Sequence, residues 1–244
     1  MRPRSIFVSD VHLGCKHART DDFLRFLRGS QPEFLYLVGD VFDGWRLRKG
    51  WYWRSAYTDI VERLLEMART GTRIFYTPGN HDDFLRNFRQ LPTLENIEIA
   101  DEFIHVTADN RRLLVMHGDR FDKVTTNHLW LTYFGDAAYN AAIVFDRSVN
   151  VVWRRLGGAR MHISRFLKDW VKRLANSYSR FEESLAGYAR GQGCHGIVCG
   201  HVHTPALVER TGEVAYYNTG AWVENCSAIV EDSAGRLQLM SSPS

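Results

Sequence analysis

The chain has 244 residues, of which 45% are apolar and 24% are charged, and its formal net charge is +3. This balance is typical of an ordinary globular protein and excludes a disordered or fibrous chain. Such a small charge does not by itself indicate a nucleic-acid partner. Because the length suits one sizeable core and is short for two independent ones, we expect a single domain over residues 1–244.

The sequence shows no targeting or membrane-spanning segment. The first apolar run, Ile6–Val8, has three residues, whereas the apolar part of a signal peptide needs about 7–15. No later window approaches the roughly 18 apolar residues of a spanning helix. The cysteines form neither CxxC pairs nor zinc-ribbon spacing, which favours free thiols in a reduced compartment; they are Cys15, Cys194, Cys199 and Cys226. We therefore expect a cytoplasmic protein that touches membranes only from the surface.

The first half of the chain alternates predicted strands with predicted helices. Apolar residues at helical spacing indicate one helix that begins at Thr20, its expected cap, and a second helix that Gly71 ends. Consecutive short strands punctuated by glycines are predicted over 205–239. The pattern predicts an α/β fold with two sheets faced by helices. Buried strands are expected at five apolar runs, which are Ile6–Val8, Phe34–Val38, Ile74–Tyr76, Leu113–Met116 and Gly196–Cys199.

Residues 121–194 interrupt this alternation with basic helical patterns. Between Asp146 and Arg180 there are nine Arg or Lys residues and two Asp residues. Two interpretations stay open: a solvated basic helix packed on the core, or a helical cap whose apolar side meets a lipid and whose basic side meets anionic headgroups or phosphates. The apolar residues at helical spacing are Ile163, Phe166, Leu167, Trp170, Val171 and Leu174.

A cluster of Asp, Asn or His follows each of the five predicted strands. One such residue alone is weak evidence, because an Asp after a strand often caps a turn and a single His is more often structural. In layered α/β proteins, however, ligands gather at the carboxyl ends of strands. Asp10 and His12, two residues apart in an extended segment, also project the same way. Together the clusters supply seven oxygen and nitrogen donors: Asp10, His12, Asp40, Asn80, His117, His201 and His203.

Seven donors are too many for one tetrahedral zinc ion, and no thiolate is among them. They suit two divalent metal ions that share a bridging carboxylate; we expect manganese, with iron or zinc as alternatives. Two ions about 3.5–4 Å apart can activate water and clamp the oxygens of a phosphoryl group. Because phosphoryl transfer depends mainly on positioning and charge neutralisation, the set indicates hydrolysis of a phosphate ester or anhydride. The sequence has no GxSxG elbow, no GxxxxGK(S/T) loop and no GxGxxG that opens a helix.

The order of these motifs resembles the five-block signature of the calcineurin-like metallophosphoesterases: Asp10-x-His12, Gly39-Asp40-x-x-Asp43, Gly79-Asn80-His81-Asp82, His117-Gly118-Asp119 and Gly200-His201-Val202-His203. The resemblance implies a four-layer α/β/β/α sandwich, here with a helical cap insertion at 121–194. One metal ion would be bound by Asp10, His12, Asp40 and His203. The other would be bound by Asn80, His117, His201 and the bridging Asp40. His81 would contact the scissile phosphate or protonate the leaving group, and Asp82 would orient His81.

Three further stretches resemble the UDP-2,3-diacylglucosamine pyrophosphohydrolases of the lipid A pathway: Thr20–Leu27, Tyr36–Trp45 and Gly220–Trp222. Members of that family carry a helical cap, bind the inner membrane peripherally and release UMP and a diacylglucosamine phosphate. The resemblance implies a UDP-linked acylated sugar or similar lipid phosphate as substrate, and the anionic cytoplasmic face of the inner membrane as partner. One departure is His81, because the family usually has Arg at this position.

The substrate contacts that we expect are Asn80, His81, Asp122, Arg165, Phe166 and Trp170. A paralogous phosphodiesterase acting on another lipid-linked or nucleotide substrate is the main alternative. A nuclease ranks behind it, because the apolar, Trp-containing stretch 129–174 suits acyl chains better than a nucleic-acid backbone. We expect no nucleic-acid partner. A non-catalytic scaffold of the same fold would lack several ligands, and this sequence lacks none.

Overall fold

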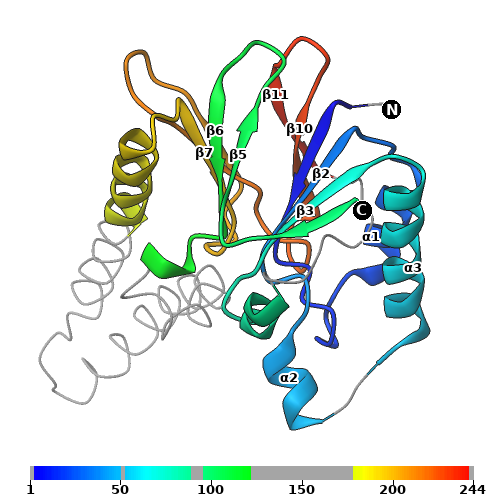
Figure 1. Cartoon of the computed structure of the whole chain (residues 1–244). Helices are drawn as coiled ribbons and strands as arrows, with labels where there is room; N and C mark the ends of the chain where they lie inside the picture. The colour runs from blue at the N-terminus through cyan, green and yellow to red at the C-terminus, as the bar shows by residue number, and fades with distance from the viewer. Residues whose placement is uncertain (1–2, 51–52, 89–95, 122–177, 242–244) are drawn as a thin grey trace, which may run out of the picture. The chain divides into compact units, whose positions relative to one another are not determined.

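The protein's structure is a computed structural model that describes residues 3–50, 53–88, 96–121 and 178–241. The chain divides into two compact units, Met1–Asp119 with Leu185–Ser244, and Arg120–Ser184. Both sheets belong to the first unit (Figure 1). The expected cap at 121–194 falls mostly outside the described residues and stays a prediction. Four expected substrate contacts also lie outside them, namely Asp122, Arg165, Phe166 and Trp170.

The first sheet has six strands in the order β11-β10-β1-β2-β3-β4. Strands β1 to β4 are parallel, whereas β10 pairs antiparallel with β1 and β11 antiparallel with β10. The parallel arrangement places the carboxyl ends of β1, β2 and β3 at one edge of the sheet. The strands are β1 (Ser5–Val8), β2 (Phe34–Val38), β3 (Arg73–Thr77), β4 (Ile97–Ile99), β10 (Ser227–Glu231) and β11 (Leu237–Ser241).

The second sheet has five strands in the order β5-β6-β7-β9-β8. Its three central strands are parallel, and the two edge strands pair antiparallel with their neighbours. The predicted run of short strands near the C-terminus is confirmed, because β8 to β11 follow one another along the chain. The strands are β5 (Phe103–Val106), β6 (Arg112–Val115), β7 (Gly196–Cys199), β8 (Ala206–Val208) and β9 (Ala215–Asn218).

The alternating direction of side chains along the strands of the first sheet determines how the layers pack. Ile6 and Val8 of β1 belong to a core cluster with the apolar faces of α1 (Thr20–Arg28) and α3 (Ser55–Arg69). Phe7, between them, points the other way and belongs to a cluster shared with the second sheet. Side chains on successive strand residues point to opposite faces, so one strand serves both interfaces. The helices therefore cover one face of the first sheet, and the second sheet covers the other.

A helical segment covers 178–191, and its part from Leu185 onward belongs to the same unit as the second sheet. Figure 1 shows its final residues beside β6 and β7, on the side away from the first sheet. The Tyr188 hydroxyl donates to the Glu102 carboxylate at 3.0 Å, just before β5, and so ties this helix to the sheet. The α/β/β/α order of layers expected from the sequence is confirmed. Among the described helices, none combines the length and the apolar character needed to cross a bilayer.

The predicted helix boundaries hold for α3 and need a correction for α1. Helix α3 ends at Arg69, and Gly71 follows with a φ of 105°, a conformation that suits glycine. Thr20 does not cap α1: it is the buried first residue of the helix, and Arg19 precedes it without a side-chain capping bond. The Thr20 hydroxyl accepts from Arg54 at 3.4 Å, so tertiary contact takes the place of the cap.

A buried polar bridge joins the two sheets near the beginning of β1. His105 of the second sheet lies 3.0 Å from the Tyr36 hydroxyl and 2.8 Å from Glu231, both of the first sheet. Arg4 donates to both Glu231 oxygens, at 2.8 and 3.0 Å, and the Ser5 hydroxyl also donates to Glu231. The Glu231 charge is thus fully paired inside the protein, as a buried carboxylate requires.

Candidate metal centre

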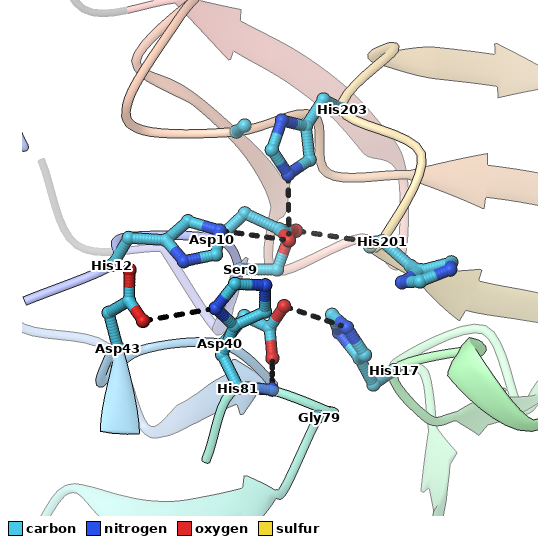
Figure 2. A network of polar contacts seen from close by, with 12 residues as sticks. Ser9, Asp10, His12, Asp40, Asp43, Gly79, His81, His117, His201 and His203 are labelled. Atoms are coloured by element: carbon cyan, nitrogen blue, oxygen red, sulfur yellow. Dashed lines mark hydrogen bonds and ion pairs between the residues drawn. The ribbon is translucent and has the colours of Figure 1, made fainter. Parts of the chain in front are cut away.

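The predicted donors meet where strands of both sheets end. Each donor lies in a loop that follows a strand: Asp10 and His12 after β1, Asp40 after β2, Asn80 after β3, His117 after β6, and His201 and His203 after β7. Figure 2 shows the carboxylates of Asp10 and Asp40 between the imidazoles of the surrounding histidines. The first sheet therefore supplies the carboxylates, and the second supplies most of the histidines.

Among the described residues, three groups of side chains within this centre are spaced for metal binding, and two of them contain Asp10. In one, Asp10 Oδ1 lies 3.2 Å from His203 Nε2 and 3.8 Å from His12 Nε2. In the other, Asp40 Oδ2 lies 3.4 Å from His117 Nε2, and Asp10 completes the group. The potential ligand atoms of each group lie within 4.8 Å of one another. The third group joins His12, Asp43 and His81. The first group contains three of the four ligands predicted for one ion, whereas the second combines Asp40 and His117 with Asp10, which the prediction gives to the other ion. The assignment of ligands to two ions stays a prediction.

The donor set fits divalent ions because several of its buried polar atoms have no hydrogen-bond partner within the described part of the chain. These atoms are Asp10 Oδ1, Asn80 Oδ1 and His117 Nε2. An unpaired buried polar atom is costly, so such atoms call for an ion or a ligand. Burial lowers the pKa of His12 to about 4, which keeps that imidazole neutral, as metal ligation requires. Burial acts to raise the pKa of Asp40, but His117 outweighs it and lowers that pKa, so the carboxylate stays ionised.

The backbone at the donors adopts an uncommon conformation. The φ angles of Asp10, His12, Asp40, His201 and His203 lie between 51° and 71°. Non-glycine residues seldom occupy this left-handed region, although Asp and His do so more often than most. Backbone strain of this kind clusters at functional sites, where the surrounding structure holds it in place. Sharp turns at the strand ends thus direct the donor side chains toward one another at the edge of the sheets.

Gly79 lets the third loop approach the donors closely. A Cβ at this position would lie 2.7 Å from His117 Nε2 and would overlap the Asp40 carboxylate. We therefore expect Gly79→Ala to displace both donors and to lower metal affinity at least about tenfold, the lower end of the effect of disturbing a ligand's support.

The matched control for this change is Gly187→Ala, because a Cβ on Gly187 meets nothing within 4 Å. Metal content after dialysis and the thermal midpoint of both variants would be measured. Gly79→Ala protein that retains its ions at the wild-type level would contradict the close packing described here.

Asp82 has a different role from the predicted one. Its carboxylate accepts backbone N–H groups of Gly79 at 2.6 Å, Val41 at 2.8 Å and Asp40 at 3.2 Å, and it also accepts the Tyr76 hydroxyl. Burial and the nearby Asp40 charge raise its pKa to about 6. Asp82 therefore joins the loops after β2 and β3. The prediction that it orients His81 is wrong, because the buried carboxylate makes its hydrogen bonds to these loops instead.

Asp43 is the carboxylate that contacts His81. Its Oδ1 lies 3.2 Å from His81 Nδ1, and the Trp45 ring lies 4.1 Å from the imidazole, centre to centre. Burial works to lower the pKa of His81, but Asp43 and Asp40 outweigh it and raise that pKa. Asp43 was visible in the sequence as the last residue of the second motif block, but no role was assigned to it. Trp45 ends the Tyr36–Trp45 stretch that the sequence singled out, but no contact with His81 followed from it.

His81 lies beside the predicted metal ligands, and its ring also forms a possible metal-binding group with His12 and Asp43. Its backbone N–H donates to Asp40 Oδ1 at 2.8 Å, while its ring is held between Asp43 and Trp45. Divalent ions bound by the neighbouring donors would supply charge neutralisation for a phosphoryl group. A protonated imidazole beside that group can donate a proton to a leaving oxygen. The arrangement suits hydrolysis of a phosphate ester or anhydride.

Comparison with known proteins agrees with this geometry. Residues 3–205 match the calcineurin-like phosphoesterase family. The chain is 34% identical to a UDP-2,3-diacylglucosamine hydrolase of Xanthomonas campestris, with 95% of this chain and 96% of the relative covered. It is 28% identical to a DNA polymerase II small subunit of Methanothermobacter thermautotrophicus, over 48% of this chain and 30% of the relative. The E. coli phosphoesterase Yfce superposes with a TM-score of 0.48 at 17% identity and covers 98% of this chain and 99% of its own. The chain belongs to the calcineurin-like phosphoesterases and is a metal-dependent hydrolase of phosphoric esters or anhydrides.

Proposed function

We propose that the protein hydrolyses the pyrophosphate of UDP-2,3-diacylglucosamine and releases UMP and 2,3-diacylglucosamine 1-phosphate. The observation that carries this proposal is the near-full-length similarity to the Xanthomonas hydrolase. The converging donors support it, because a pyrophosphate presents several oxygens that two ions can clamp. In this proposal Asp10, His12, Asp40 and His203 hold one ion. Asp40, Asn80, His117 and His201 hold the other, and manganese is the preferred metal.

His81 supports a second candidate, a paralogous phosphodiesterase for another lipid-linked or nucleotide substrate. The chain has an Asp43-paired histidine where the pyrophosphohydrolases it resembles usually carry Arg. An imidazole can transfer a proton at neutral pH, whereas a guanidinium stays protonated and acts through its charge. The leaving groups that the two side chains favour therefore differ: His81 suits an oxygen that must be protonated.

The two candidates are separated by offering substrates side by side to the purified full chain with Mn²⁺. The panel is UDP-2,3-diacylglucosamine, bis-p-nitrophenyl phosphate and single-stranded DNA, with Asp40→Ala protein as the background control. We expect UMP release from the lipid with a kcat/KM of about 10⁴–10⁸ M⁻¹s⁻¹, the usual range for an enzyme on its own substrate. Hydrolysis of the diester with no UMP release would favour the paralogue, and preference for DNA would favour a nuclease.

The proposal includes a cytoplasmic location with peripheral contact at the anionic inner membrane, through the cap that we predict at 121–194. Each basic residue near an anionic surface contributes about 1 kcal/mol, and salt screens the contribution. We expect that changing Arg165, Lys168, Lys172 and Arg173 to Gln weakens sedimentation with anionic vesicles and leaves diester hydrolysis nearly intact. Wild-type protein that ignores such vesicles at low salt would contradict the membrane contact.

A further inference from the structure

The loop after β9 contacts His203 twice. Glu224 Oε1 lies 2.8 Å from His203 Nδ1, and Asn225 donates from Nδ2 to the His203 backbone oxygen at 3.4 Å. The opposite ring nitrogen of His203, Nε2, faces Asp10 Oδ1 at 3.2 Å. One nitrogen of the imidazole therefore points to the expected ion, and the other points to a carboxylate outside the donor set.

We propose that Glu224 is a positioning residue for His203 and sets the affinity of the ion that His203 shares with Asp10 and His12. This inference rests on the proposed assignment of His203 as a metal ligand. A histidine that donates its second N–H to a carboxylate is held in one tautomer and one ring orientation, and it becomes a stronger electron donor. Glu224 therefore keeps the Nε2 lone pair directed at the ion.

The loop that carries Glu224 is built to hold this position. The backbone N–H groups of Glu224, Asn225 and Cys226 all donate to the Ala221 carbonyl, at 3.3, 2.9 and 3.1 Å. The Asn225 side chain forms a further hydrogen bond with the same residue, because its Oδ1 accepts the backbone N–H of Ala221 at 3.2 Å. Glu224 thus projects from a tight, internally bonded turn, which fixes its backbone beside His203.

The same loop also supports Asp10. The backbone N–H of Trp222 donates to the Asp10 carbonyl at 3.1 Å. The Trp222 ring is fully buried and packs against Phe23 and Phe26 of α1. Two predicted ligands of one ion, Asp10 and His203, therefore share one support. This gives a structural role to the Gly220–Trp222 stretch, which the sequence singled out without assigning one.

The second group of donors is supported differently. His117 Nδ1 lies 2.9 Å from the Val38 carbonyl, so a backbone group takes the place that Glu224 has at His203. A side-chain change at Glu224 should consequently affect one ion and spare the other. A merely structural role in the loop would instead lower the stability of the whole protein without selecting one ion.

The test uses the full chain with Glu224→Gln, which keeps the size of the side chain and removes its charge, and Glu224→Ala. The control is Glu213→Gln, an exposed glutamate whose partner is Arg210 at 3.5 Å on the surface. Stepwise Mn²⁺ affinities would be measured by titration with electron paramagnetic resonance, in the absence of substrate. The thermal midpoint without added metal would be measured in parallel.

We expect one of the two Mn²⁺ affinities to fall about 10–100-fold in the Glu224 variants, as for other lost carboxylate partners of ligating histidines. The other affinity and the thermal midpoint should stay at the Glu213→Gln level. Unchanged affinities in both Glu224 variants, or equal losses at both ions, would overturn the proposal; if Glu224→Ala does not fold, Glu224→Gln decides. Failure to release UMP from the lipid would overturn the proposed substrate and leave this metal measurement unaffected.

Discussion

Replacing Asp40 with alanine is expected to remove both divalent ions and to lower hydrolysis about 10³-fold or more. Asp40 is 2% exposed, and Oδ2 lies 3.4 Å from His117 Nε2. Its other oxygen accepts the His81 N–H at 2.8 Å, so it also shapes the loop after β3. Losing a shared carboxylate removes several kcal/mol of charge stabilisation, and each 1.4 kcal/mol corresponds to a factor of ten in rate.

Metal content per chain, measured by elemental analysis after gel filtration, gives the direct readout. His201→Ala, a change at a predicted ligand of one ion, serves as the comparison and should retain one ion. Circular dichroism establishes that each variant is folded. Asp40→Ala protein that still holds two ions per chain would rule out the bridging role.

Replacing His81 with alanine is expected to lower kcat by about 10²–10⁴, the range for a lost general acid, while both ions remain bound. The imidazole lies 3.2 Å from the Asp43 carboxylate and 4.1 Å from the tilted Trp45 ring, centre to centre. Burial works to lower the pKa of His81, but Asp43 and Asp40 raise it, which favours the protonated form that can give a proton to a leaving oxygen. Loss of metal together with activity would show that His81 is a ligand.

Asp43→Asn is the companion change to His81→Ala. It removes the charge that faces His81 Nδ1 at 3.2 Å but leaves the ring in place, so we expect a smaller fall in kcat. The apparent pKa of the alkaline limb of the rate profile, where a general acid loses its proton, should also be lower.

His81→Arg tests the divergence from the pyrophosphohydrolases. A gain in UMP release from the lipid with that variant would assign the difference in substrate to this position.

The sequence predicted the donors because apolar runs stop abruptly at Asp, Asn and His residues, and strand ends of an α/β fold share an edge. It did not predict strand order in the first sheet. β10 lies beside β1 through pairs such as Ser5 with Glu231, which are distant along the chain, and local patterns carry no information on such pairing. The two-sheet architecture was nevertheless predicted, because strands alternate with helices in the first half of the chain and follow one another directly over 205–239.

Partners of the donors were harder to predict than the donors. Asp82 follows His81 directly, which suggested contact between them, yet its carboxylate turns to the Val41 and Gly79 backbone. Asp43 reaches His81 only because β2 and β3 are neighbours. Glu224 stands far along the chain from His203, and nothing in its surroundings marks it as a partner. Contacts of this kind depend on loop conformations that apolar periodicity does not determine.

The bridge between Arg4, Glu231 and His105 has a consequence for how accurately the metal centre is built. Donors come from both sheets, so any sliding of one sheet over the other would change the 3.4 Å separation of Asp40 and His117 directly. Apolar contacts between sheets are non-directional and resist sliding poorly. Hydrogen bonds that cross between the sheets join His105 to Tyr36 at 3.0 Å and to Glu231 at 2.8 Å, and such bonds weaken steeply when their geometry is disturbed. The polar bridge at the start of β1 thus limits movement between the sheets, and so it fixes the distances between metal donors at the opposite end of the same strands.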